Sequence, residues 1–179
     1  SARLRPDDVV SAWAGIRPLL PSAGATPGGA SREHAVTTSA HGLISITGGK
    51  LTTYRVMAAD VVKEVVHRVR RRRGADLAKT TPLFGGDFSS LNDLIAGAVL
   101  AVRDIRLATH LVSSYGSRWN DVWAAICGPG GRLGLVDGLP YTVGELRYCM
   151  EHEMACTFAD LFVRRTHLAF ETRDHGLSA

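Results

Sequence analysis

The sequence predicts an α+β protein, in which a strand-rich segment with one long helix precedes a small all-α domain. Three observations predict this class. β-prone runs bounded by turn residues are confined to the first 50 residues. Apolar residues recur at helical spacing from about residue 52 onward. A breaker-rich stretch interrupts the helical pattern at 75–88. We therefore expect a first part at 1–74, a linker at 75–88 and an all-α domain at 89–179.

The elements of the first part follow from β-prone runs and the turn residues between them. A strand is expected over residues 10–20, where two prolines end it. The Gly-, Pro-, Ala- and Ser-rich residues 22–30 predict an exposed loop. Two further β-prone runs, 33–38 and 43–47, flank the turn at 41–42 and predict a hairpin or adjacent strands.

A long helix is expected over residues 52–72, ended by Gly74. Its apolar side chains recur at i, i+4, i+7, i+8 and i+11, which places them on one face of a helix. The members of this apolar stripe are Ala58, Val62, Val65, Val66 and Val69.

The part at 89–179 has helical periodicity throughout and no internal repeat. Two capping-box patterns, Ser90-Leu91-Asn92-Asp93 and Thr142-Val143-Gly144-Glu145, each predict a helix start. The first cap predicts a helix from 90 to about 102, and two further helices are expected over 103–115 and 119–127. The second cap predicts a helix that begins at 142, and the residues 158–170 repeat the helical pattern.

The composition fits a folded protein of one sizeable domain or two small ones. The chain has 179 residues, 45% of them hydrophobic, so it can bury a core. No apolar run is long enough to span a bilayer, and no secretory signal stands at the start. Much of the net charge of +4 lies in Arg68 and the four arginines 70–73. A solvated helix end best explains this cluster; an anionic membrane surface comes next, and nucleic acid last.

The three cysteines, Cys127, Cys149 and Cys156, are expected to be free thiols. Their number is odd and no CxxC pair occurs. On one helix, Cys149 and Cys156 would lie two turns apart, roughly 10 Å by the helical rise, which is too far for a disulfide. Free thiols are typical of a reducing cytoplasm.

The most informative motif is ISITGGKLTT, residues 44–53. A short apolar strand leads into a double-glycine turn, and the helix that follows opens with a lysine and two threonines. Such a turn lets the backbone approach a ligand closely and directs unpaired helix N–H groups toward it, so it favours negative charge. Taken alone, the glycine pair is equally typical of an ordinary tight turn.

This motif, extended by Tyr54-Arg55, resembles the flavin-contacting loop of FAD-dependent glycerol-3-phosphate dehydrogenases. The resemblance continues upstream in WAGIRPL, residues 13–19, and in Ser31-Arg32, and downstream in Met57-Ala58. It implies that the chain is the carboxy-terminal third or so of such an enzyme. That portion comprises an arm of the substrate sheet, the last FAD helix of a Rossmann-type flavoprotein, and the family's all-α C-terminal domain.

The resemblance implies three substrate-binding side chains. Arg17 would lie near the reacting carbinol, Arg32 would hold the phosphate, and Lys50 would lie between the phosphate and the flavin. Arginine suits phosphate because its planar fork presents paired donors and stays charged. Outside this context, solvent-exposed ion pairs would be the better interpretation of both arginines.

The resemblance also implies that the turn contacts FAD. Hydride arrival leaves negative charge on the pyrimidine edge of the flavin, and a helix N-terminus stabilises charge that develops there. The implied cofactor-binding residues are Gly48, Gly49, Lys50, Leu51 and Thr52.

No catalytic residue is assigned. His34 and His41 could act as acid–base groups by their usual pKa, but polar positions on a strand and a turn explain them better. The family's catalytic histidine is expected in an amino-terminal part that this chain lacks.

Two patterns near the carboxyl end receive structural interpretations. The run 152–156, HEMAC, approaches the HExxH zinc motif, but no third ligand is evident and no metal is expected. Asp160, Arg164 and Arg165 resemble an Asp-x-x-x-Arg-Arg-Thr signature of the family's C-terminal domain. An i, i+4 ion pair within a helix is the expected use of this signature.

The resemblance implies oxidation of sn-glycerol 3-phosphate to dihydroxyacetone phosphate, with electrons passed from FAD to a membrane quinone. It implies a cytoplasmic enzyme attached peripherally to the inner membrane, allows a homodimer and involves no nucleic acid. The GxGxxG fingerprint that holds the FAD pyrophosphate does not occur, so the chain alone is expected to be inactive. Two alternatives remain: an oxidase that uses O2, and a non-catalytic helical module for dimerisation or membrane docking.

Overall fold

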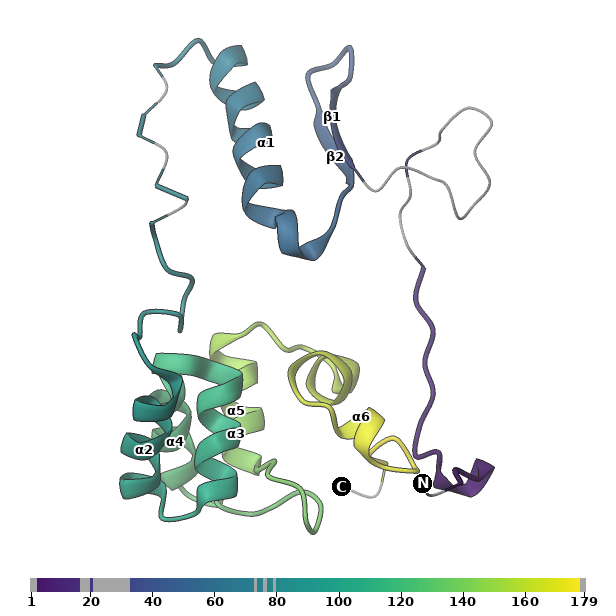
Figure 1. Cartoon of the computed structure of the whole chain (residues 1–179), viewed down its shortest axis with the longest axis vertical. Helices are drawn as coiled ribbons and strands as arrows, with labels where there is room; N and C mark the ends of the chain where they lie inside the picture. The colour runs from purple at the N-terminus through teal and green to yellow at the C-terminus, as the bar shows by residue number, and fades with distance from the viewer. Residues whose placement is uncertain are drawn as a thin grey trace. The chain divides into compact units, whose positions relative to one another are not determined.

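A computed structural model of the chain describes residues 3–16, 20, 33–72, 74–75, 77–78 and 80–177. It divides into two compact units, Ala14–Thr81 and Ser1–Trp13 with Pro82–Ala179. Strands β1 and β2 and helix α1 belong to the first unit, and helices α2 to α6 to the second (Figure 1). The expected α+β class is confirmed.

The first unit contains the expected hairpin. Strand β1 (His34–Thr38) pairs antiparallel with β2 (Ile44–Gly48), with His34 opposite Gly48. Gly42 takes a φ of 88° in the connecting turn, a left-handed value that glycine adopts at little cost. The hairpin delivers the end of β2 directly into the double-glycine turn.

Helix α1 (Tyr54–Arg68) follows a 3₁₀ turn at Leu51–Thr53 and ends earlier than expected. Arg70 has a φ of 50°, and the Arg71 N–H donates to the Val66 carbonyl at 3.2 Å. A left-handed residue, followed by an N–H that donates to a carbonyl of the last helical turn, is a typical helix C-terminus. The predicted helix over 52–72 is therefore too long at its carboxyl end.

The apolar stripe of α1 is not covered within its own unit. Val62 is 58% exposed, Val69 57% and Val65 39%. No described residue between 14 and 81 falls in the buried class. A hairpin with one helix and no closed core is only marginally stable by itself. Within this unit, the described residues do not cover the apolar stripe of α1.

The strand predicted over residues 10–20 is wrong for residues 10–16, which form no strand. Residues 17–19 lie outside the described part of the chain, as does the loop predicted at 22–30. A strand needs a neighbour for its N–H and C=O groups. Residues 10–13 belong instead to the helical unit, where the Ser11 hydroxyl donates to the Phe170 carbonyl at 2.7 Å.

Three side-chain caps set the starts of the helices in the second unit. Ser90 Oγ accepts from the Asp93 N–H at 3.2 Å, and Thr142 Oγ1 from the Glu145 N–H at 3.3 Å. Arg103, with a left-handed φ of 59°, ends the first of these helices. The next residue, Asp104, caps the helix that follows by accepting from the Arg106 and Leu107 N–H groups. The principal helices are α2 (Leu91–Val102), α3 (Ile105–Tyr115), α4 (Trp119–Cys127) and α5 (Val143–His152).

The four principal helices enclose the main hydrophobic core. Each contributes apolar side chains from one face, and α3 contributes the largest share, in keeping with its amphipathic sequence. Fully buried members of this core include Ala98, Ala108, Leu111, Val122, Ile126 and Cys149.

The helical pattern predicted at 158–170 forms two short helical segments instead of one continuous helix. Asp160–Arg165 forms a π-helical turn, and α6 covers only Leu168–Glu171. Thr166 ends the turn because both its N–H and its hydroxyl donate to the Leu161 carbonyl, each at 2.8 Å. A hydrogen bond spanning five residues defines this wider turn.

Residues 82–88, which we call the strap, pack on the junction between α3 and α4. The Ser117 N–H donates to the Gly85 carbonyl at 2.9 Å. A Cβ built on Gly116 would lie 1.9 Å from that same oxygen. Glycine at 116, with a φ of 56°, therefore permits this close approach of two backbones.

The predicted ion pair of the carboxy-terminal signature forms. Arg164 Nη1 lies 2.7 Å from Asp160 Oδ1, and Arg165 Nη1 pairs with Glu153 Oε2 at 3.3 Å. Asp160 also accepts from the Thr157 hydroxyl and from the Cys156 and Thr157 N–H groups. These donors, the Thr157 hydroxyl foremost, hold the pKa of Asp160 below its ordinary value.

The lowered pKa of Asp160 predicts acid sensitivity. A carboxyl whose folded-state pKa is depressed stabilises the fold above its unfolded pKa, and this contribution is lost as pH falls through the folded value. Below about pH 4, the free energy of unfolding of the wild-type chain should therefore fall more steeply than that of Asp160→Asn. Urea unfolding at pH 7 and pH 3 checks this, with the exposed Asp137→Asn as the control for losing one charge. Parallel pH profiles for the wild type and Asp160→Asn would contradict the assignment.

Candidate functional site

The double-glycine turn has a backbone that only glycine accommodates. Gly48 and Gly49 take φ values of 77° and 79°. A Cβ on Gly48 would lie 2.4 Å from the Glu33 carbonyl oxygen, and one on Gly49 would lie 2.6 Å from Met57 Sδ. The Gly49 N–H donates to the Glu33 carbonyl at 3.0 Å and ties the turn to the start of β1. The two glycines thus fix the path from β2 into the helix.

The helix start beyond the turn is exposed and electropositive. The Thr53 hydroxyl donates to the Lys50 carbonyl at 2.9 Å and accepts from the Lys50 N–H at 3.3 Å. The N–H groups of Leu51 and Thr52 come first in the helical stretch, so no carbonyl inside the helix faces them. Lys50 and Thr52 are exposed, and Leu51 is 88% exposed. The exposed Lys50 side chain and the N–H groups of Leu51 and Thr52, which have no acceptor within the helix, suit an anionic ligand.

The structure places only one of the three predicted substrate-binding residues. Lys50 lies at the helix start described above. Arg17 and Arg32 lie outside the described residues. Their grouping with Lys50 stays a prediction.

His34 has a structural partner. Its Nε2 lies 2.8 Å from Asp60 Oδ2 on α1, and Thr38 Oγ1 donates to Glu64 Oε1 at 3.2 Å. These two contacts hold β1 on the helix that begins at the turn. His41 is exposed at the hairpin tip. The sequence carried a signal for these contacts: two polar residues four apart on a strand, and two acidic residues four apart on a helix.

A groove lies beside these contacts, between β1 and α1. Its volume is about 480 Å³, and it is lined by His34, Val36, Asp60, Lys63, Glu64 and His67. The Arg68 guanidinium hydrogen-bonds to Glu64, and this contact, the largest cause, lowers the pKa of the Glu64 carboxyl. Asp60 and Glu64, the two carboxylates of the groove, are therefore already engaged in packing the hairpin.

A buried polar cluster in the helical unit escaped the sequence prediction. Glu145 is 0% exposed, and its Oε1 lies 2.9 Å from the Tyr115 hydroxyl and 2.8 Å from His110 Nε2. The same hydroxyl lies 3.4 Å from Cys149 Sγ. Burial raises the pKa of the Cys149 thiol to about 11, and burial next to Glu145 raises that of Tyr115. The sequence assigned Glu145 only to a helix cap, because polarity alone does not reveal burial.

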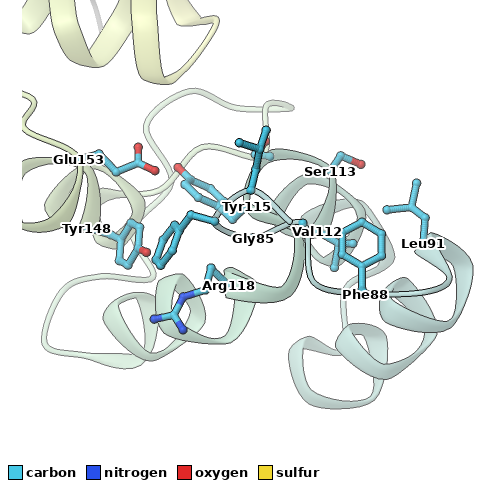
Figure 2. A pocket seen from close by; sticks show the side chains of 14 residues that line it. Gly85, Phe88, Leu91, Val112, Ser113, Tyr115, Arg118, Tyr148 and Glu153 are labelled. Atoms are coloured by element: carbon cyan, nitrogen blue, oxygen red, sulfur yellow. The ribbon is translucent and has the colours of Figure 1, made fainter. Parts of the chain in front are cut away.

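The strap forms one wall of a hollow of about 400 Å³ on the helical unit (Figure 2). Phe84 and Phe88 line it from the strap, and Tyr148 and Glu153 from α5 and the residue after it. The Arg118 guanidinium lies 4.8 Å from the centre of the Phe84 ring. The hollow combines an apolar wall with one arginine, Arg118, and one glutamate, Glu153.

The zinc-like run does not form a metal site. Helix α5 ends at His152, and Met154 takes a φ of 58°, so the helical spacing between His152 and Cys156 is broken. Among the described residues, no three His, Cys, Asp or Glu side chains are placed to hold a metal ion. The three cysteines are free. Within the same residues, no helix is long and apolar enough to cross a bilayer.

Known proteins resemble this chain over nearly its whole length. Residues 77–179 match the family model described as the C-terminal domain of alpha-glycerophosphate oxidase. A probable mitochondrial glycerol-3-phosphate dehydrogenase of Dictyostelium discoideum is 35% identical over 97% of this chain and 28% of its own length. The mitochondrial glycerol-3-phosphate dehydrogenase of Rattus norvegicus is 38% identical over 93% of this chain and 24% of its own.

A solved structure agrees with these matches. The glycerol-3-phosphate dehydrogenase of Bacillus halodurans, complexed with FAD, has 32% identity and a TM-score of 0.61, covering 76% of this chain and 29% of its own. The present chain thus spans less than a third of the length of these relatives. It belongs to the glycerol-3-phosphate dehydrogenase family and corresponds to the carboxy-terminal portion of its members, with the family's C-terminal domain at residues 77–179.

Proposed function

We propose that this chain is the carboxy-terminal portion of an FAD-dependent enzyme that oxidises sn-glycerol 3-phosphate to dihydroxyacetone phosphate. One observation carries the proposal. The tight turn at Gly48 and Gly49, where a Cβ would clash with Glu33 or Met57, leads into a helix start with an exposed Lys50. The named activity of the relatives and the FAD bound by one of them support it.

The residues of the turn fit a flavin. FAD, when bound, would supply the hydride acceptor and would carry negative charge at its pyrimidine edge once reduced. Glycine at 49 makes this tight turn possible, because a Cβ there would lie 2.6 Å from Met57 Sδ. The N–H groups of Leu51 and Thr52 and the positive end of the helix stabilise negative charge where it develops. Gly48, Gly49, Lys50, Leu51 and Thr52 are accordingly the proposed cofactor-binding residues.

The proposed substrate side consists of Arg17, Arg32 and Lys50. Glycerol 3-phosphate is a dianion at neutral pH, so several fixed cations are needed to hold it. Binding energy from the non-reacting phosphate then positions the reacting carbon. Lys50 follows the flavin turn directly, and this position allows it to contact phosphate and flavin together.

The chain alone is proposed to be inactive. It carries no GxGxxG turn for the FAD pyrophosphate. The exposed valines of α1 and the absence of buried residues among those described between 14 and 81 are consistent with a unit completed by the rest of the enzyme. The domain division 1–74, 75–88 and 89–179 stays a proposal; in the compact units, residues 1–13 and 82–88 group with the helices.

The proposed electron acceptor is a membrane quinone, reached by peripheral attachment at the inner face of the membrane. The second candidate is an oxidase that passes electrons to O2, which the family model's description favours. Hydrogen peroxide formed in proportion to substrate oxidised would identify the oxidase, whereas quinone-dependent turnover without peroxide would identify the dehydrogenase. A homodimer is a further proposal that neither outcome affects.

Replacing Lys50 in the complete enzyme tests the proposed site. Lys50→Ala should lower kcat/KM for glycerol 3-phosphate about 10-fold to 100-fold, because a charge-assisted contact contributes about 1.5–3 kcal/mol. Lys63→Ala is the matched control, since Lys63 is an exposed lysine of the neighbouring helix α1. Steady-state kinetics at saturating acceptor measures both. Equal kcat/KM in the two variants would refute the role of Lys50.

A further inference from the structure

The carboxyl end of α1 carries a group of exposed arginines. Arg68 is the last residue of the helix, and three further arginines occupy positions 70–72. All four residues are exposed. We call them the basic end of α1.

The carboxylates on the same helix do not neutralise the basic end. Glu64 Oε1 lies 2.8 Å from Arg68 Nε, and Asp60 Oδ2 lies 2.8 Å from His34 Nε2. Among the residues that the structure describes, no acidic side chain forms an ion pair with the arginines 70–72. Three adjacent cations therefore face solvent without a carboxylate partner.

The helix dipole accounts for Arg68 better than for the other three arginines. A helix C-terminus attracts cations, but this effect falls off within the last turn. The helix ends at Arg68, and Arg70 takes a left-handed φ of 50°, so residues 70–72 lie beyond the helical residues. The solvated helix end that the sequence favours thus leaves residues 70–72 without an explanation.

The side chains of the basic end suit an anionic lipid surface. Clustered arginines are attracted to anionic headgroups, and the membrane interface also accommodates an apolar side chain beside them. Val69 lies among the arginines and is 57% exposed. Single-stranded nucleic acid is instead bound through aromatic side chains that stack on its bases, and residues 62–72 contain no Phe, Tyr or Trp.

We propose that the basic end of α1 binds an anionic lipid surface. This inference deepens the proposed function and rests on it for its purpose, which is to bring the flavin enzyme to a quinone in the membrane. Helix α1 has 15 residues, so its basic end lies about 20 Å along the helix from the double-glycine turn (Figure 1). Lipid contact at this end does not occupy the turn.

Binding of the complete enzyme to vesicles tests this surface. The wild type should co-sediment with vesicles of phosphatidylcholine mixed with phosphatidylglycerol, and far less with phosphatidylcholine alone. Combining Arg70→Gln, Arg71→Gln and Arg72→Gln should weaken binding to the mixed vesicles roughly 100-fold, because each arginine near an anionic surface contributes about fivefold. Added salt should weaken wild-type binding by screening the charges.

Two control proteins separate lipid binding from other effects of the substitutions. Lysine at all three positions 70–72 should keep binding within about threefold of the wild type, because a lipid surface responds to charge rather than to the planar guanidinium. Combining Arg3→Gln, Arg5→Gln and Arg103→Gln removes three exposed arginines outside the basic end and should leave binding unchanged. Circular dichroism should show that every variant is folded.

The outcomes separate this inference from the proposed function. Equal vesicle binding by the wild type and the glutamine variant of residues 70–72 would overturn the lipid contact and leave the proposed oxidation intact. The same holds for an equal loss in the lysine variant or in the control with three distant substitutions. A glutamine variant that loses affinity for a single-stranded oligonucleotide but not for vesicles would overturn it in favour of nucleic acid. Vesicle binding without oxidation of glycerol 3-phosphate would overturn the proposed function and leave the lipid contact in place.

Discussion

Glu145→Ala should destabilise the helical domain by about 3–5 kcal/mol, the cost of removing one partner from a buried polar cluster and leaving a cavity. Its carboxylate is fully buried and accepts from Tyr115 and His110 through one oxygen. Removing it leaves both partners without their acceptor and opens a cavity between α3 and α5. Denaturant unfolding of the whole chain, followed by far-ultraviolet circular dichroism, measures the change.

Two further variants make the result specific to the buried contacts. Glu145→Gln keeps the shape and one acceptor oxygen, so it should cost only about 1–3 kcal/mol. Glu151→Ala is the matched control, a glutamate of the same helix whose side chain is 59% exposed. Ordinary surface substitutions change the free energy of unfolding by less than about 0.5 kcal/mol. If the free energies of unfolding of Glu145→Ala and Glu151→Ala differed by no more than this, the Glu145 side chain would not hold α3 and α5 together.

Gly48→Ala should deprive the complete enzyme of most of its flavin. The added Cβ would lie 2.4 Å from the Glu33 carbonyl oxygen, a main-chain atom that cannot move aside alone. The turn must therefore shift, and the proposed flavin-facing backbone shifts with it. We expect flavin affinity to fall at least tenfold, measured by flavin absorbance of the purified enzyme and by titration of the apoenzyme with FAD.

Gly42→Ala separates local strain from the loss of the site. Gly42 has a similar φ of 88° in the hairpin turn, but a Cβ there meets nothing within 4 Å. Gly42→Ala should lose about 1–2 kcal/mol of stability, because alanine is strained in the left-handed region; Gly48→Ala should lose more, because its Cβ also clashes with the Glu33 carbonyl. Only Gly48→Ala should lose flavin. Equal flavin retention in the two variants would contradict a role of the turn in FAD binding.

The helices and the hairpin were predictable because their determinants are local. Ser90 and Thr142 cap the helices that their capping boxes predicted, and helix 119–127 has the predicted bounds. The hairpin follows from two β-prone runs around a glycine turn. Each signal lies within about ten residues, so one sequence contains it.

The errors arose where distant contacts decide the structure. Residues 10–16 have a β-prone sequence, yet residues 10 to 13 belong to the helical unit and no strand forms. The strap has the composition of a linker, but Gly116 admits its backbone against the helices. The helical periodicity over 158–170 did not reveal that Thr166 donates twice to one carbonyl. Periodicity cannot report contacts of this kind.

The candidate site was predicted in part. The sequence identified the tight turn, and Gly48 and Gly49 take the left-handed φ values that such a double-glycine turn requires; the role of Lys50 stays a prediction. It missed Asp60 and Glu64, which hold β1 on α1, because the four-residue spacing that they share with His34 and Thr38 does not by itself show that helix and strand are in contact. Arg17 and Arg32 owe their assignment to the family resemblance.

Anaerobic titration of the complete enzyme with glycerol 3-phosphate tests the central claim most directly. The claim is that the turn at Gly48 and the side chain of Lys50 form one edge of a site where this substrate reduces FAD. We predict stoichiometric bleaching of the oxidised flavin by glycerol 3-phosphate, a markedly higher half-saturation in Lys50→Ala, and no bleaching by glycerol at the same concentrations. A flavin that glycerol 3-phosphate does not reduce, or one that glycerol reduces equally well, would contradict the claim.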